Sequence, residues 1–449
     1  MLPPQYHWRR RRFSYSKEVS VLANNKPPFY GWIVVVVACL CYGFGIAPGY
    51  YSWGFFAPHV MEDLDATRAG VGAVFGLFLL VLSLVGPLVG FAQSRWGVRV
   101  VMTVGSCAAA AGFALTSRAT SLVAAFFTFS IIAGVGVGFS TTVPCQTLAT
   151  HWFVRYRARA TAVIMATGGL VGIFISTFDA WLLSFSTWRT GWLVIAAISA
   201  AVAGLAAAFV RTSPEEMGQR PDGEPSNGDP DEGCPAENCS ERRLDSDWTV
   251  AKAARTPHFA VLIVCGLASV LPWGVAISHG PLHMRDLGYS EPFTAGLIST
   301  MALASIAGRI CASLADLVSP RQFLAVALFV QGIGTYGFVL AQDPGAVYVS
   351  AAMLGLGFGA AYVAVAVVTA AFFGRQAFGT ILGIRMSISG MFGAVAPWLA
   401  GLTYDRLGSY HLAFLALTLF GIVSAVLIAF CPRPRLPHDR PLLDEPPSS

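Results

Sequence analysis

Two arginine residues lie inside runs of the sequence that are otherwise apolar. Arg309 falls within residues 294–315, and Arg385 falls within a run that starts near Phe378. A charge at the centre of a bilayer-spanning helix costs about 2.5–3.5 kcal/mol on insertion scales, and a guanidinium cannot become neutral by losing its proton. Such a group must face water, an anion or a partner, and it can hold a carboxylate by two parallel hydrogen bonds. The two arginines therefore predict an anion-binding site.

Each arginine also has a simpler interpretation. Arg309 would then be a packing residue bonded to helix carbonyls, and Arg385 would extend its head group to the membrane surface. With a rise of 1.5 Å per residue, the two side chains fall at one depth in helices that run in opposite directions. This shared depth favours the anion site as the main hypothesis.

Other side chains are expected at the same depth. Hydroxyl groups of Tyr362, Tyr42 and Thr141 could bond the second carboxylate oxygen or a 2-hydroxyl, and the alternative is that each is a packed wall residue. Trp273 is either an apolar lid over the substrate or a packing residue. His279 and His283 are expected at the outer surface.

The composition indicates a membrane protein. Of the 449 residues, 55% are hydrophobic and 12% are charged, whereas about 25% are charged in soluble domains. The net charge of +5 lies mostly in loops and tails, so it does not predict nucleic-acid binding. We expect no cofactor and no metal, because Cys234 and Cys239 share a polar segment without a histidine, and we assign them no role. The predicted spans contain no nucleophile–base pair at membrane depth, so the sequence does not suggest an enzyme.

The apolar runs form two groups of six, which predicts an all-α polytopic membrane protein with twelve transmembrane helices in two six-helix halves. The expected segments are a basic N-terminal tail (1–29), a first half (30–210), an acidic linker (211–257), a second half (258–431) and a C-terminal tail (432–449). The acids, prolines and glycines of the linker cannot bury apolar surface. A short amphipathic helix is expected within residues 246–255.

The basic residues indicate the orientation. Most of the 29 lysine and arginine residues fall on one side if both termini lie inside. Because cytoplasmic loops carry the excess of basic residues, both termini are predicted to be cytoplasmic in a cell membrane, plasma or inner.

The two halves repeat one another. Residues 90–99 (GFAQSRWGVR) correspond to residues 312–321 (ASLADLVSPR), and the glycines of 134–138 correspond to those of 355–359. The glycine runs lie in mid-helix, where they let helix backbones approach closely. Two repeated halves with a site between them are typical of transporters. Charged helix ends are expected to latch the halves together, and this predicted latch comprises Arg95, Gly97, Arg99, Asp316 and Arg321.

These features resemble the major facilitator superfamily over residues 30–431. The loop at 90–99 has the family's G-x-x-x-D-R-x-G-x-R form with Ser94 in place of the acid. The GW at 31–32, YYSWGFF at 50–56, the WF and basic loop at 152–159 and RTSPEEMGQRPDG at 211–223 resemble the branch of monocarboxylate porters and oxalate/formate antiporters. The family's drug antiporters have a glycine–proline motif in the fifth helix, whereas residues 161–178 have no proline.

The resemblance implies roles for particular positions. An arginine of the eighth helix binds the substrate carboxylate in this branch, and Arg309 stands there. The lysine of oxalate-type members falls near Ser389, with Arg385 one turn earlier. The monocarboxylate type often has an acid one turn before the arginine, where this chain has Ser305, and a lysine in the first helix, which this chain lacks.

The sequence thus predicts a secondary active transporter that moves a small organic anion, a mono- or dicarboxylate, by alternating access. Its partners would be that anion, with a proton or a counter-anion, and the lipid bilayer, and we expect a monomer. Proton co-transport, anion exchange and facilitated diffusion remain open, because no acid is predicted at mid-membrane. The alternatives are a carrier of the same family for a neutral or amphipathic metabolite, in which the arginines are structural, and a transporter-like sensor.

Overall fold

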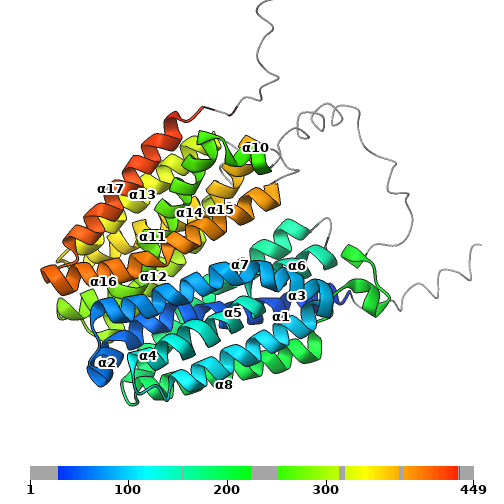
Figure 1. The fold of residues 1–449 in the computed structure, drawn as a ribbon, viewed down its shortest axis with the longest axis horizontal. Coiled ribbons are helices and arrows are strands. Elements are labelled where there is room, and N and C mark those ends of the chain that lie inside the picture. The colour runs from blue at the N-terminus through cyan, green and yellow to red at the C-terminus, as the bar shows by residue number, and fades with distance from the viewer. Residues whose placement is uncertain are drawn as a thin grey trace, which may run out of the picture.

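A computed structural model describes residues 29–153, 156–223, 250–312, 319–373, 378–432 and 434, and every regular element in these ranges is a helix. Figure 1 shows the helices in two bundles. The first bundle contains α1 (Gly31–Ala47), η2 (Pro48–Ser52), α2 (Trp53–Leu64), α3 (Arg68–Thr116), α4 (Leu122–Ala125), η3 (Phe126–Ala133), α5 (Gly134–Ser140), α6 (Thr142–Trp152), α7 (Arg157–Leu183) and α8 (Trp188–Phe209). The second contains α11 (Pro257–Asp286), α12 (Glu291–Cys311), α13 (Pro320–Leu340), α14 (Pro344–Phe373), α15 (Phe378–Gly393), α16 (Val395–Leu407) and α17 (His411–Phe430).

The helix count agrees with the sequence. Eleven helical stretches of the described residues are long and apolar enough to cross a membrane. One of them, α3, has 49 residues, and its helical conformation breaks at Gly97, whose φ is 79°. A helix of that length would extend about 70 Å, more than twice the hydrocarbon core, so α3 comprises two spans. The prediction of twelve transmembrane helices in two halves is confirmed.

The first span is one helical stretch with a change of pitch in its middle. Residues 31–64 form α1, η2 and α2 without interruption. The turn Pro48–Ser52 is π-helical, and Pro48 cannot donate a backbone hydrogen bond in this turn. Single π-helical turns inside helices often occur at functional sites.

Glycines let the helices pack at backbone distance, as the sequence predicted. In the second half, Gly355 of α14 lies against the carbonyl oxygen of Met301, and Gly359 lies against that of Ser305. In the first half, Gly136 lies against the backbone of Ala109. A Cβ atom at any of these glycines would overlap the neighbouring helix, so these positions require glycine.

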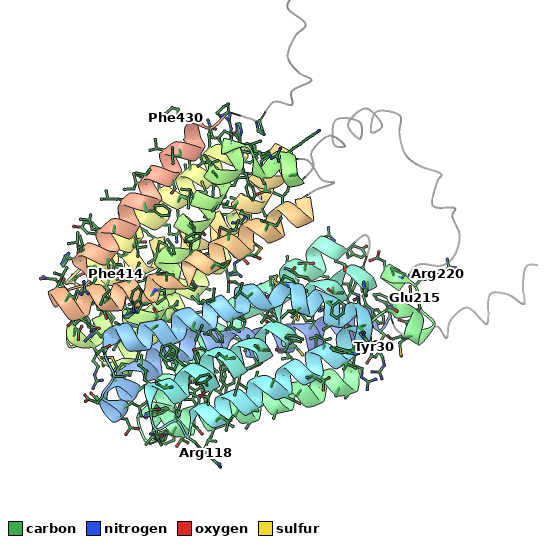
Figure 2. The ribbon with its side chains drawn as sticks, in the orientation of Figure 1. Tyr30, Arg118, Glu215, Arg220, Phe414 and Phe430 are labelled. Carbon is green, nitrogen blue, oxygen red and sulfur yellow. The ribbon has the colours of Figure 1, made fainter. Side chains whose placement is uncertain are left out.

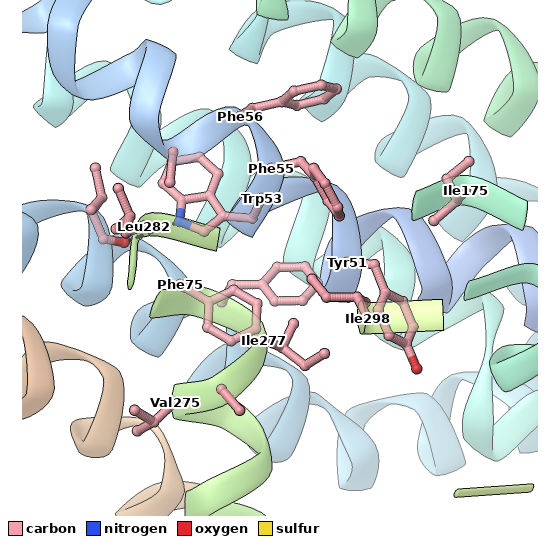
Figure 3. Close-up of a cluster of buried hydrophobic side chains, with 14 of the residues drawn as sticks. Tyr51, Trp53, Phe55, Phe56, Phe75, Ile175, Val275, Ile277, Leu282 and Ile298 are labelled. Carbon is pink, nitrogen blue, oxygen red and sulfur yellow. Dashed lines mark hydrogen bonds between the residues drawn. The ribbon is translucent and has the colours of Figure 1, made fainter. Parts of the chain in front are cut away.

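The two halves meet at one end of the molecule. We call this end the far face (residues 62–69, 285–291 and 404–411) and the opposite end the linker face (residues 93–99, 211–223 and 252–257). Figure 2 shows the halves in contact at the far face and diverging towards the linker face. One apolar core joins them on the far side, with Trp53 and Phe75 from the first half and Ile277, Leu282 and Ile298 from the second (Figure 3).

The first part of the linker packs on the first half, which its composition did not predict. The Trp152 indole Nε1 donates to the Arg211 carbonyl oxygen (2.9 Å), and the Tyr30 backbone N–H donates to Gln219 Oε1 (2.9 Å). Two short turns follow, η4 (Pro214–Met217) and η5 (Pro221–Gly223). The helix expected within residues 246–255 is present as α10 (Val250–Ala254), whereas Cys234 and Cys239 lie outside the described residues.

Candidate functional site

A cavity of about 180 Å³ lies between the two halves. The first half contributes Tyr50, Leu79 and Ser83 to its wall, and α11, α14 and α15 of the second half contribute the remainder. The wall is apolar on one side, where the Trp273 and Phe358 rings stack with centroids 4.2 Å apart and planes 11° apart. Trp273 therefore packs as a wall residue beside the space that a substrate would occupy.

Arg385 is the cation of this cavity. Its side chain lines the wall, is 6% exposed and lies close to Gly266 of α11 and to Ser389. Its Nε has no hydrogen-bond partner, and no described acid forms an ion pair with it. Removing a charge from water without a partner costs several kcal/mol, so this guanidinium is poised to bind an anion.

Arg309 lies at the boundary between the halves. Its Nη1 donates to the Met165 carbonyl oxygen of α7 in the first half (3.2 Å). Its guanidinium carbon lies 5.7 Å from the centroid of the Tyr362 ring. Tyr362 also lines the cavity and is 40% exposed. Arg309 itself is absent from the cavity wall, whereas Tyr362 lies beside Arg309 and shares the wall with Arg385.

The other predicted site residues lie further from the cavity. Tyr42 is half-buried in α1, where its ring packs against Gly168, within electrostatic range of Arg309. Thr141 lies at the break between α5 and α6, is buried, and donates its hydroxyl hydrogen bond to the Val137 carbonyl oxygen (2.6 Å). In this conformation the Thr141 hydroxyl group is used in a hydrogen bond to its own helix backbone. Of the three predicted hydroxyl residues, Tyr362 is the one that lines the cavity.

Several wall residues were not predicted to bind substrate, although Ser389 was noted at the position of the oxalate-type lysine. The Ser269 and Ser389 side chains line the cavity, are 2% and 3% exposed, and have hydroxyl groups without hydrogen-bond partners. Tyr50 and Ser83 line it from the first half. Isolated serines in apolar runs were the available signal, but such residues are common in membrane helices and bond their own backbone, as Ser83 does with the Leu79 carbonyl oxygen (2.9 Å).

His279 corrects one expectation, because it is fully buried rather than at the outer surface. One of its ring nitrogens lies 3.1 Å from the Tyr410 hydroxyl, and the other lies 2.7 Å from the Pro397 carbonyl oxygen. Gly72 of α3 leaves space beside the ring. His279 lies two turns before the end of α11 at Asp286, where α3 and α16 cover it.

Charged groups join the halves at the far face. Arg285 Nη2 lies 2.6 Å from Glu62 Oε1, and His59 Nε2 lies 3.4 Å from Glu291 Oε1. Arg68 of α3 contacts Asp286 of α11 with both terminal nitrogens. Each of these contacts crosses from the first half to the second, so this conformation is closed at the far face.

Two of the predicted latch residues at the linker face bond within their own halves. Arg95 is exposed, and Gly97 forms the break in α3. Arg99 Nε donates to the Ala207 carbonyl oxygen (2.7 Å), and Arg321 Nη1 donates to that of Cys431 (2.5 Å). Asp316 lies outside the described residues. The latch between halves therefore stays a prediction for a conformation closed at the linker face.

Metal chemistry finds no support in the described ranges, where no group of three or more histidine, cysteine or acidic residues could hold an ion.

The sequence profile of the Major Facilitator Superfamily matches residues 32–340 and 292–448. Monocarboxylate transporter 2 of Rattus norvegicus is 24% identical over 443 residues, covering 92% of this chain and 87% of that protein. Monocarboxylate transporter 4 of Gallus gallus is 24% identical, covering 92% and 86%.

The fold agrees with these sequence relatives. A crystal structure of a D-xylose-proton symporter superposes with a TM-score of 0.72 at 13% identity, covering 90% of this chain and 98% of that one. The family, the sequence relatives and the D-xylose-proton symporter are all transporters, so the chain is a transporter and not an enzyme. It belongs to the major facilitator superfamily of secondary transporters and, within it, resembles the monocarboxylate branch.

Proposed function

We propose that the protein carries a small organic anion, a mono- or dicarboxylate, across the membrane by alternating access. The observation that carries this proposal is Arg385, a buried cation without an acidic partner that lines a cavity between the halves. A carboxylate can accept two parallel hydrogen bonds from the guanidinium. The unpartnered hydroxyl groups of Ser269 and Ser389 can donate to the same anion.

Arg309 has a second role in this proposal. Its bond to the Met165 carbonyl oxygen links the halves, and the Tyr362 ring beside it lines the cavity. An anion is a stronger acceptor for a guanidinium than a neutral carbonyl group. A bound carboxylate would therefore draw Arg309 away from Met165, with Tyr362 and Tyr42 as polar neighbours, and so connect binding to the movement of the halves.

The apolar wall fits a short carbon chain or a ring beside the carboxylate. The stacked Trp273 and Phe358 rings offer a flat apolar surface, while the relatives named monocarboxylate transporters support a carboxylate substrate. The second candidate is a neutral or amphipathic metabolite that uses the same wall, with the arginines acting structurally. The Arg309–Met165 hydrogen bond is the observation that favours this candidate.

The remaining parts of the proposal concern the membrane. The linker face would be cytoplasmic, with both termini on that side of a plasma or inner membrane, because basic residues concentrate there. When the far face opens, Arg95, Gly97, Arg99, Asp316 and Arg321 would latch the linker face. The protein would act as a monomer, with a proton or a counter-anion as the coupled ion.

A thermal-shift experiment on the purified full-length protein tests the substrate class. Because a ligand that binds only the folded state raises Tm, we expect mono- or dicarboxylates to raise it and neutral sugars and organic cations to leave it unchanged. Arg385→Ala should abolish the shift, and Arg309→Ala should reduce it. The matched control is Arg118→Ala, an exposed residue away from the cavity. A shift with neutral ligands that survives both substitutions would establish the second candidate instead.

A further inference from the structure

Asp179 of α7 is the one acidic side chain in the described ranges that is buried, with an exposed fraction of 0%. It lies four residues before the end of the helix at Leu183, which places it about 6 Å below the far end. Neither carboxyl oxygen has a hydrogen-bond partner, and no described cation forms an ion pair with it. The mechanism proposed above does not use this residue.

The surroundings of Asp179 favour the uncharged acid. A carboxylate without a partner is costly in an apolar environment, whereas a carboxylic acid loses much less hydration and gains an O–H donor. Its polar neighbour is Ser52, whose hydroxyl group is also 0% exposed and without a partner. A protonated Asp179 can donate to the Ser52 oxygen, so one proton would satisfy both side chains.

The ionisable groups around this site are engaged elsewhere. In the elements packed against α7, the charged side chains at the far end form ion pairs at the surface: Asp63 of α2 with Arg189 of α8 (2.6 Å), His59 of α2 with Glu291 of α12 (3.4 Å), and Glu62 of α2 with Arg285 of α11 (2.6 Å). Tyr51 of η2 packs against Gly172, two turns before Asp179. None of these groups supplies a positive charge that would hold Asp179 as a carboxylate.

The site is connected to the cavity through one turn of helix. Ser52 ends the π-helical turn Pro48–Ser52, and Tyr50 in the same turn lines the cavity. Tyr51 lies between Tyr50 and Ser52 in the chain. Its ring packs edge-on against the Trp273 ring of the second half, with the ring centroids 6.4 Å apart. A shift of this turn would therefore act on Asp179, on the cavity wall and on the contact between the halves.

We propose that Asp179 is a proton-binding site of the transport cycle, with Ser52 as its hydrogen-bond partner and the turn Pro48–Ser52 as its link to the anion cavity. A hydronium ion in the water on the open side breaks one O–H bond and becomes water, its proton forms an O–H bond with one carboxylate oxygen, and nothing is oxidised or reduced. The site would take the place of the acid that the sequence does not show at mid-membrane. Only its link to anion movement rests on the proposed function.

Infrared difference spectroscopy of the full-length protein tests the proton site without any substrate. We expect the C=O stretching band of a protonated carboxyl group at neutral pH in the wild type. Asp179→Asn should lose this band. Asp63→Asn, which replaces an acid at the surface, should keep it. A wild-type spectrum without the band, or one that Asp179→Asn leaves unchanged, would overturn the proposal.

Transport in proteoliposomes tests the link to the anion. With radiolabelled lactate as the probe, Asp179→Asn should retain exchange at equal pH on both sides but lose accumulation driven by a pH gradient. Accumulation equal to that of the wild type would refute the coupling role. If the wild-type protein moves no lactate while thermal shifts identify no carboxylate, the proposed function fails, and the infrared result alone decides the proton site.

Discussion

Arg68 and Asp286 hold the two halves together at the far face with a two-pronged contact. Arg68 Nη1 lies 2.7 Å from one Asp286 oxygen, and Nη2 lies 2.5 Å from the other. The Tyr410 hydroxyl accepts a further bond from Arg68 (3.0 Å), and the guanidinium lies 3.8 Å from the centroid of the Tyr404 ring. Asp405 accepts from the Arg68 backbone N–H (3.2 Å). We call these five residues the far-face lock.

The far-face lock predicts a shift in conformation when Arg68 is removed. A hydrogen-bonded ion pair that is partly shielded from water contributes about 1–3 kcal/mol, which corresponds to about a 5- to 150-fold change in an equilibrium. Arg68→Ala should therefore favour the conformation open at the far face. The measurement is alkylation of a cysteine introduced in the wall at Ser83, by a reagent added from the far side.

Two variants make this measurement specific. Arg118→Ala removes an exposed charge that is not part of the lock and should leave alkylation unchanged. Arg68→Asp combined with Asp286→Arg should recover part of the closed population, because the pair is restored with reversed charges. Equal alkylation of Arg68→Ala and the wild type would show that the lock contributes little to closure.

A second prediction concerns the glycines where α3 meets α16. Gly76 faces the Ala394 carbonyl oxygen so closely that a Cβ atom would overlap it. Gly76→Val should therefore prevent closure of the far face and reduce transport by at least tenfold while the protein still folds. Gly90→Val in the same helix is the matched control, since a Cβ atom there would meet no group of another helix within 4 Å. Uptake and Tm measured on both variants would separate blocked closure from misfolding.

The cavity serines give a third prediction. Neutral hydrogen bonds contribute about 0.5–1.5 kcal/mol each, so Ser269→Ala and Ser389→Ala should each weaken carboxylate binding by about two- to tenfold. Titration calorimetry with the carboxylate that gives the largest thermal shift would measure this change in Kd. Ser184→Ala, at an exposed position, should bind like the wild type. Unchanged affinity in both cavity variants would mean that Arg385 holds the anion without them.

The sequence alone determined the architecture, because hydropathy and charge act locally. Twelve apolar runs imply twelve spans wherever each helix packs, and the glycine runs near Gly136 and Gly357 indicated close helix contacts. Arg309, Arg385 and Tyr362 were recognisable for the same reason: a polar group in an apolar run is conspicuous before the fold is known.

Only the tertiary structure decided which of these groups share a cavity. Arg385 and Tyr362 line it, whereas Arg309 reaches across to Met165 and Thr141 turns to its own backbone. The burial of His279 and Asp179 and the contact between Arg68 and Asp286 were equally inaccessible from the sequence. Each depends on the rotation of a helix about its axis and on the contact of two halves far apart in sequence, and neither is encoded in the composition of a single span.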